Sequence, residues 1–188
     1  MVDKRKKKIF QFTGLSGSGK TTLALEVGTL LREQGYVVQV LDGDEMRKSI
    51  SAGLGFSRSD RLENMKRIAR YARECPADVV LIAVINPYAE GRDYIRHNTR
   101  APLIWIRCGV DILKQRDTKG LYKKALLPDS HPARLGNLSG INDPFEEPQD
   151  ADFVVDTDKD SIARSAFHLC AYISGKLCQR DSSGITLS

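Results

Sequence analysis

The amino-acid sequence predicts an α/β protein with a mostly parallel, five-stranded sheet and helices on both faces. Apolar stretches that suit buried strands alternate along the chain with segments whose apolar residues recur at helical spacing. Such alternation is typical of parallel sheets, because each parallel strand needs a crossover connection before the next. The stretch 78–85 is apolar almost throughout, which suits a strand covered on both faces.

The first half of the chain supplies three strands and three helices. A strand is predicted around residues 9–12, followed by a helix that Gly35 ends, as a glycine after a helix commonly does. Residues 36–41 predict the second strand, and a short helix follows to about residue 51. Ser57 with Asp60 has the spacing of a capping box, which predicts a helix to about Glu74. Pro76 then leads into the third strand at 78–85.

The second half predicts a helix near 91–98, a fourth strand at 103–106, a helix at 110–116, a fifth strand at 153–155 and a closing helix at 161–177. Residues 118–150 differ in character, with four prolines and little periodicity. Because loops of this length are usually functional, we interpret 118–150 as a mobile lid rather than a second domain.

The 188 residues predict one domain at 9–178, with a basic N-terminal tail at 1–8 and a C-terminal tail at 179–188. The net charge of +5 comes from the tail, because residues 4–8 are all basic and the rest has 24 basic and 24 acidic residues. The domain itself therefore gives no indication of nucleic-acid or membrane partners. We also find no apolar run of membrane-spanning length and no secretory signal.

The four cysteines give no metal or disulfide pattern. Cys75, Cys108, Cys170 and Cys178 form no C-x-x-C pair, and the three histidines do not cluster with them. This spacing argues against a zinc site and a disulfide framework, and it favours the reducing cytoplasm as the compartment.

One stretch carries a specific motif. Residues 14–21, Gly-Leu-Ser-Gly-Ser-Gly-Lys-Thr, fit the phosphate-binding pattern G-x-x-x-x-G-K-[ST] between a predicted strand and a predicted helix. Backbone N–H groups of such a loop point at bound phosphates, the lysine reaches the outer phosphates and the threonine hydroxyl can ligate Mg²⁺. The pattern predicts a nucleoside triphosphate site and a fold of the P-loop hydrolase or kinase type. Its residues are Gly14, Ser16, Gly17, Ser18, Gly19, Lys20, Thr21 and Thr22.

Acidic residues follow the second strand. Ligands of parallel sheets bind beyond the carboxyl ends of the strands, so the loops after strands one to four should line the site. In many nucleotide hydrolases an acidic residue ends a long apolar strand and supports Mg²⁺. Here the long third strand ends in the neutral Asn86, so Asp42 and Asp44 are the carboxylates expected to take that role. One carboxylate could support magnesium while the other accepts a hydroxyl proton. We therefore predict Asp44, Asp42 and Lys20 as catalytic residues, and Thr21 with Asp42 as the metal site.

Two cationic clusters accompany these residues. Arg47, Arg61 and Asn64 lie near predicted strand ends, where they could hold an anionic acceptor. Residues 116–124, which begin with Arg116 and contain Lys119, open the lid and could close over transferring phosphates, as suits a kinase.

Taken together, the motifs resemble the adenylylsulfate kinase (APS kinase) family over roughly residues 10–158. The phosphate loop alone is shared by many enzymes, whereas Leu-Asp-Gly-Asp at 41–44 and Lys-Gly-Leu-Tyr-Lys-Lys-Ala at 119–125 are more specific. The other matching stretches are Leu54-Gly55-Phe56-Ser57, Asp60-Arg61 with Glu63-Asn64, Pro87-Tyr88, Arg116-Asp117 and Ser139-Gly140-Ile141.

The resemblance implies an ATP-dependent phosphotransferase that uses Mg²⁺ and forms homodimers. This family transfers the γ-phosphate of ATP to the 3′-hydroxyl of adenosine 5′-phosphosulfate, in sulfate assimilation. By resemblance, Asp44 is the carboxylate near that hydroxyl, Phe56 stacks on the acceptor's adenine, and Arg116 belongs with the ATP-binding residues. The implied acceptor-binding residues are Asp44, Arg47, Phe56, Arg61, Asn64, Ile85, Asn86, Lys119, Leu121 and Leu138.

The chain departs from the family pattern at several positions. Asn86 stands where the family usually has serine, Leu138 where it has the second aromatic residue of the base sandwich, and Glu45 where it has asparagine. The lid is several residues longer. These departures leave open a kinase for another nucleotide 3′-hydroxyl, such as a cytidine diphosphoramidate kinase, or another small-molecule kinase. A non-catalytic nucleotide-binding module is the alternative from a different class.

Overall fold

The computed structural model describes residues 6–179, and its five strands form one parallel sheet in the order β2-β3-β1-β4-β5. The strands are β1 (Lys8–Thr13), β2 (Val38–Asp42), β3 (Val79–Ala83), β4 (Leu103–Arg107) and β5 (Phe153–Asp156). The helices are α1 (Lys20–Glu33), α2 (Gly43–Lys48), α3 (Arg58–Glu74), α4 (Ala89–Thr99), α5 (Val110–Arg116), α6 (Leu121–Ala125) and α7 (Ile162–Cys178).

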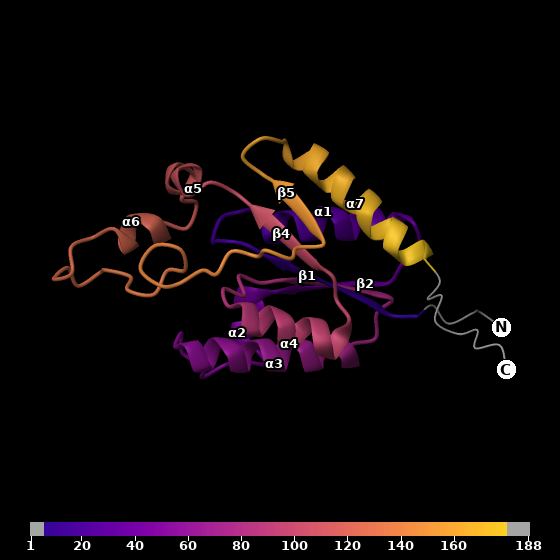
Figure 1. Ribbon diagram of the computed structural model, residues 1–188, viewed down its shortest axis with the longest axis horizontal. Helices are drawn as coiled ribbons and strands as arrows, with labels where there is room; N and C mark the ends of the chain where they lie inside the picture. Colours follow the sequence, from indigo (N-terminus) through magenta and orange to yellow (C-terminus); the bar gives the residue numbers. More distant parts are fainter. Residues whose placement is uncertain (1–5, 180–188) are drawn as a thin grey trace.

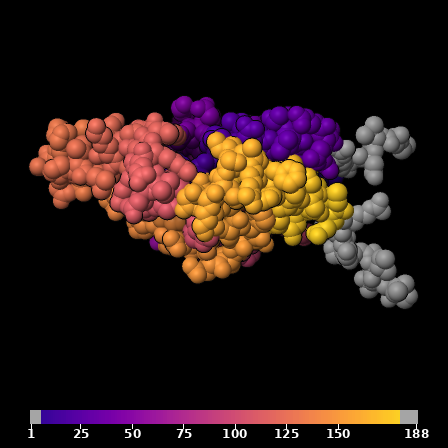
Figure 2. All heavy atoms as spheres, turned by 90° about the horizontal axis from the view of Figure 1, so that it is seen from above, coloured from indigo at the N-terminus to yellow at the C-terminus, as the bar shows by residue number. Residues whose placement is uncertain are grey.

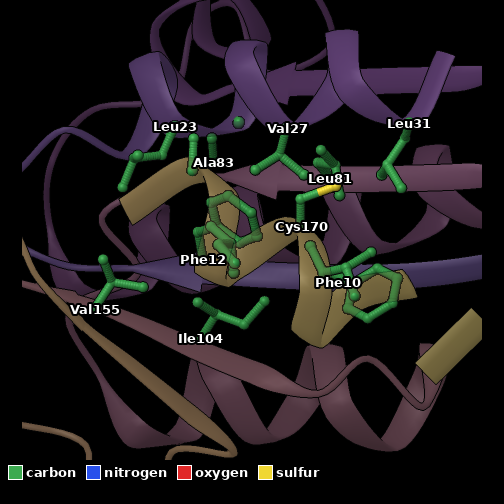
Figure 3. Close-up of a cluster of buried hydrophobic side chains, with 14 of the residues drawn as sticks. Phe10, Phe12, Leu23, Val27, Leu31, Leu81, Ala83, Ile104, Val155 and Cys170 are labelled. Atoms are coloured by element: carbon green, nitrogen blue, oxygen red, sulfur yellow. The ribbon is translucent and has the colours of Figure 1, made fainter. Parts of the chain in front are cut away.

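Helices cover both faces of the sheet, α1 and α7 on one side and α3 and α4 on the other (Figure 1). The alternation along β1 explains the two cores, because successive side chains of a strand point to opposite faces. Phe10 and Phe12 pack with Leu23 and Val27 of α1 (Figure 3), whereas Ile9 belongs to the core beneath α3. The predicted fold class is therefore confirmed.

Most predicted elements lie within a few residues of their expected positions. Ser57 caps α3 through its hydroxyl, which accepts a hydrogen bond from the N–H of Asp60 at 3.2 Å, and the helix ends at Glu74 as predicted. The third strand is shorter than expected and ends at Ala83, opposite Asp42, the last residue of β2. Val84 and Ile85 therefore continue the chain beyond the ladder.

Residues 118–150, called the lid segment here, extend from one end of the molecule (Figures 1 and 2). The segment contains a helix that the sequence did not predict, α6, which is only five residues long. Asp117 starts it, because its carboxylate accepts the N–H groups of Tyr122 and Lys123 at 3.0 and 2.9 Å. A small third core of Cys108, Leu113, Tyr122, Ala125 and Leu138 joins the segment to the body.

Three other expectations from the sequence concern the cysteines, membrane-spanning segments and the two tails. All four cysteines are free thiols, and the described residues contain no cluster of histidine, cysteine and carboxylate side chains that could hold a metal. None of the described helices has the length and apolarity needed to cross a membrane. The two tails lie mostly outside residues 6–179, so the proposed division into tails and domain, like the lid's mobility, stays a prediction.

Candidate active site

The phosphate loop connects β1 to α1 by a path that requires glycine. Gly14 has φ 148°, and a Cβ there would lie 2.3 Å from the carbonyl oxygen of Ile106, so a side chain would collide with β4. Gly19, directly before α1, has φ 97° in the left-handed region that glycine adopts without strain. In the part of the chain that the structure describes, the N–H groups of Lys20, Thr21 and Thr22 donate to no backbone or side-chain acceptor. The start of α1 therefore offers free donors to an anion.

A cleft of about 560 Å³ opens over this loop. Its walls come from the loop, the ends of β2 and β3 with Asp42, Asp44 and Ile85, and the start of the lid segment. A larger hollow of about 1110 Å³ lies at the opposite, amino-terminal edge of the sheet, where Lys6–Lys8 and Arg96 line it. We identify the smaller cleft as the candidate site, because ligands of parallel sheets bind at the carboxyl edge.

Lys20 lies at the bottom of the cleft and is only 7% exposed. Its ammonium group donates a hydrogen bond to the carbonyl oxygen of Leu15 at 2.7 Å. Burial, and to a lesser extent the positive charge of Lys119, lower the pKa of Lys20 to about 7, although Asp42 and Asp44 oppose both effects. A bound polyanion would stabilise the charged form of this lysine.

Thr21 and Asp42 form an oxygen pair on one wall. The hydroxyl of Thr21 donates to Oδ2 of Asp42 at 2.6 Å. Oδ1 of the same carboxylate accepts the N–H groups of Asp44 and Glu45 at 2.9 and 3.2 Å, so Asp42 also caps α2. The cap fixes the carboxylate's orientation toward Thr21.

Asp44 follows on the first turn of α2, and its carboxylate is paired with the ammonium of Lys119 at 2.5 Å. Both side chains are more than half exposed and both line the cleft. The pair connects the lid segment to the start of α2 at the wall of the cleft.

The residues expected to hold the acceptor gather beside α2 and α3. The guanidinium of Arg47 stacks on the ring of Phe56 at 4.4 Å, and Phe56 is 49% exposed. Arg61 donates from Nε to the carbonyl oxygen of Phe56 at 3.0 Å and pairs with Asp143 at 2.8 Å. Asn64 is buried, and its Oδ1 has no hydrogen-bond partner among the described residues.

Two acceptor residues lie elsewhere than the sequence suggested. Leu138 is 4% exposed and packs in the third core with Leu113 and Tyr122, so in this arrangement it presents no surface to a base. Asn86 is 3% exposed with φ 41° and does not line the cleft, and its backbone oxygen accepts a hydrogen bond from Arg92 at 3.2 Å. Leu138 is therefore buried in the third core, and Asn86 is buried at a turn of the backbone.

Of the remaining residues predicted for the site, some line the cleft and others pack against the third core. Ile85 and Arg116 line the cleft, and Arg116 also donates to the carbonyl oxygen of Thr157 at 2.7 Å. Leu121 lies at the start of α6 and packs against the third core. The loop after β4 does not line the cleft as expected, because Cys108 turns into that same core.

Sequence reasoning missed one wall of the cleft. Its residues follow β5 and begin α7, namely Thr157, Asp160, Ser161, Ile162 and Ser165. The signal was available, because a fifth parallel strand ends at the same edge of the sheet as the other four. Tyr122 was also missed as a site residue, although its hydroxyl donates to the carbonyl oxygen of Ser16 at 2.8 Å.

The parallel sheet, the glycine-rich loop before α1 and the cleft above it define a nucleotide-binding protein of the P-loop class. The family model described as adenylylsulphate kinase matches residues 6–156. The chain is 43% identical over 163 residues to an adenylyl-sulfate kinase of Chloroflexus aurantiacus, covering 85% of each protein. It is 38% identical over 180 residues to a probable adenylyl-sulfate kinase of Bacillus subtilis, covering 93% of this chain and 89% of the relative.

Solved structures agree with the family match. The Mycobacterium tuberculosis APS kinase CysC in complex with AMPPNP and APS superposes with a TM-score of 0.79 at 32% identity, covering 90% of this chain and 98% of that one. The chain belongs to the adenylylsulphate kinase family and is a kinase. The predicted family and enzyme class are confirmed, and the alternative of a non-catalytic module is not supported.

Proposed function

We propose that this kinase transfers the γ-phosphate of ATP to the 3′-hydroxyl of adenosine 5′-phosphosulfate. The observation that carries the proposal is that Asp44 links two groups of residues. It lines the same cleft as Lys20 and the start of α1, and it shares the helix α2 with Arg47, whose guanidinium lies over Phe56. A carboxylate there can accept the hydroxyl proton while the phosphoryl group moves.

Several features support ATP as the phosphoryl donor. The glycine loop offers N–H groups and one buried ammonium to a polyphosphate, and the cleft extends to Ile162 and Ser165, which leaves room for a base. The related M. tuberculosis enzyme is described in complex with AMPPNP and APS. We propose that Gly14, Ser16–Thr22 and Arg116 bind ATP.

The oxygen pair of Thr21 and Asp42 fits magnesium. Mg²⁺ prefers oxygen ligands and is usually held by one or two carboxylates together with substrate phosphates. The hydroxyl of Thr21 and Oδ2 of Asp42, 2.6 Å apart, provide such donors beside Lys20. When bound, the ion would neutralise charge on the phosphates. We propose Thr21 as a ligand and Asp42 as its supporting carboxylate.

The chain's own residues divide the remaining tasks. Lys20 compensates charge on the outer phosphates, and Lys119 must release Asp44 before that carboxylate can accept a proton. Transfer is direct from donor to acceptor, because Asn86 cannot carry a phosphate as a serine could. The buried position of Asn86 supports this interpretation.

The acceptor would be held by aromatic and cationic contacts. The half-exposed ring of Phe56 can stack on a base, and Arg47, Arg61 and Asn64 can contact the anionic group. Arg61 is paired with Asp143 in this state, so an acceptor anion would compete with that carboxylate. Leu138 would need to leave the third core to cover the base's second face.

Acceptor identity is the prediction most exposed to test. We expect a higher kcat/KM on adenosine 5′-phosphosulfate than on a cytidine diphosphate-type acceptor, because Arg47 and Arg61 gather at the half-exposed ring of Phe56, as an anionic adenine nucleotide requires. Both compounds are compared side by side with ATP and Mg²⁺, with product analysis. A higher kcat/KM on the cytidine compound would contradict the proposed acceptor and favour the related kinase for another nucleotide 3′-hydroxyl.

Magnesium dependence tests the metal assignment separately. Asp42→Asn keeps an oxygen that can cap α2, because asparagine is as good a cap as aspartate, but it removes the charge beside Thr21. We expect the Mg²⁺ concentration for half-maximal rate to rise about tenfold, the scale of lost outer-sphere support. Asp111→Asn, at an exposed carboxylate of α5, is the matched control. Equal magnesium dependence in both variants would contradict the assignment.

Assembly and location stay proposals. The family resemblance suggests a homodimer, the cysteine pattern favours the cytoplasm, and the Thiobacillus denitrificans neighbour is described as a hexameric APS kinase. We propose a homodimer with small-molecule nucleotide substrates and no nucleic-acid or membrane partner.

A further inference from the structure

Side chains from outside the phosphate loop hold two of its carbonyl groups. The hydroxyl of Tyr122 donates to the carbonyl oxygen of Ser16 at 2.8 Å. The hydroxyl of Thr157 donates to that of Ser18 at 2.9 Å, which is nearer than its other acceptor, the carbonyl oxygen of Arg107 at 3.2 Å. The donors come from different places, Tyr122 from α6 in the lid segment and Thr157 from the loop after β5.

Each of these carbonyls shares a peptide plane with the N–H of the following glycine. Because the peptide is planar and trans, a C=O held by a side-chain donor directs the N–H of the same peptide toward the opposite side of the peptide. The peptides concerned are Ser16–Gly17 and Ser18–Gly19. Among the described residues, the N–H groups of Gly17 and Gly19 donate to no protein acceptor. They are therefore free to bind phosphate oxygens.

Packing keeps the tyrosine in place. Tyr122 is 3% exposed, and burial raises the pKa of its hydroxyl to about 12, so it stays protonated and can donate. Leu15, the neighbour of Ser16, packs against the same core as Tyr122. Gly140 approaches Leu15 so closely that a Cβ on the glycine would lie 2.6 Å from its side chain. The lid segment thus contacts the phosphate loop at two places, Ser16 and Leu15.

We propose that Tyr122 and Thr157 are positioning residues, which fix the Ser16–Gly17 and Ser18–Gly19 peptides so that both glycine N–H groups face the donor's phosphates. The inference rests on the proposed function only in taking a nucleoside triphosphate as donor. It gives the lid helix α6 a role on the donor side of the cleft, in addition to any contact with the acceptor.

The test removes single hydroxyl groups. Tyr122→Phe and Thr157→Val are compared with Tyr172→Phe, a matched control on α7 whose buried hydroxyl has no partner within residues 6–179. Affinity for tripolyphosphate, measured by calorimetry, reports on the loop without base or acceptor. We expect each test variant to bind tripolyphosphate about three- to tenfold more weakly, the scale of one hydrogen bond, and the control to match wild type.

Steady-state kinetics separates positioning from general damage. Because these contacts lie on phosphates in both ground and transition states, KM for ATP should rise while kcat and KM for the acceptor stay unchanged. Wild-type tripolyphosphate affinity and KM for ATP in Tyr122→Phe would overturn the proposal for Tyr122. Equal rises of KM for both substrates with a lowered Tm would overturn it as well, since they indicate a structural role only. If Tyr122→Phe does not fold, Thr157→Val still tests the principle.

The tripolyphosphate measurement and the acceptor comparison distinguish failure of the positioning role from failure of the proposed function. A different preferred acceptor would leave the tripolyphosphate result unchanged, because that measurement contains no acceptor. Unaltered tripolyphosphate binding in both variants, with adenosine 5′-phosphosulfate as the preferred acceptor, would overturn the positioning role alone.

Discussion

Replacing Lys20 with alanine should abolish phosphoryl transfer, with kcat/KM lowered about 10³-fold or more, the upper range for removing one preorganised donor from a site. Lys20 is the buried cation at the bottom of the cleft, next to Thr21 and Asp42. Phosphoryl transfer depends almost entirely on positioning and electrostatic stabilisation, so loss of this buried charge removes a large part of that stabilisation. Initial rates at saturating and limiting ATP measure the loss.

Lys114→Ala is the matched control, since Lys114 is a lysine on α5 that pairs with Asp111 near the surface and does not line the cleft. It should retain wild-type rates. Near-normal turnover of Lys20→Ala at saturating ATP would mean that the loop is not the catalytic nucleotide site.

Proton uptake gives a second readout of Lys20 in the wild-type protein. Its pKa is near 7 without ligand, and a bound polyphosphate should raise it, so binding takes up a proton at pH values above 7. Linkage then requires full affinity below pH 7 and weaker affinity as the pH rises toward the pKa of the complex. Calorimetry of ATP binding in buffers of different ionisation enthalpy measures this proton.

Much of the donor side could be predicted from the sequence because its determinants are local. The phosphate loop combines fixed spacing with a strand before it and a helix after it. Asp42 and Asp44 follow directly from the rule that parallel strands end at one edge. Both carboxylates line the cleft with Lys20, as that rule requires.

Burial and long-range contacts could not be predicted in the same way. The role expected for Leu138 assumed an exposed side chain, whereas an apolar cluster from three different segments encloses it. Tyr122 contacts Ser16 across 106 positions of sequence, and no local pattern encodes that hydrogen bond. The helix α6 was missed because it is short and depends on Asp117 rather than on apolar periodicity.

Asp44 is the residue on which the proposed chemistry depends. It lies on the first turn of α2, where Asp42 caps the helix and fixes its start. Its carboxylate faces the cleft and has Lys119 as an ion-pair partner at 2.5 Å. The side chain is well exposed, so replacing it leaves no buried group without a partner.

Asp44→Asn should therefore fold normally and lose about 10²–10⁴ in kcat, the usual range for positioned proton transfer. Asparagine retains the size and an acceptor oxygen but cannot take the hydroxyl proton, so the loss isolates the proton-transfer step. Asp42→Asn, measured in parallel at saturating Mg²⁺, should retain far more activity, since its defect is in the metal requirement. Rates, Tm and ATP affinity are compared for both variants. Small and equal losses in the two would contradict the separate roles, and a large loss in Asp44→Asn accompanied by a lowered Tm would indicate damage to α2 instead of lost proton transfer.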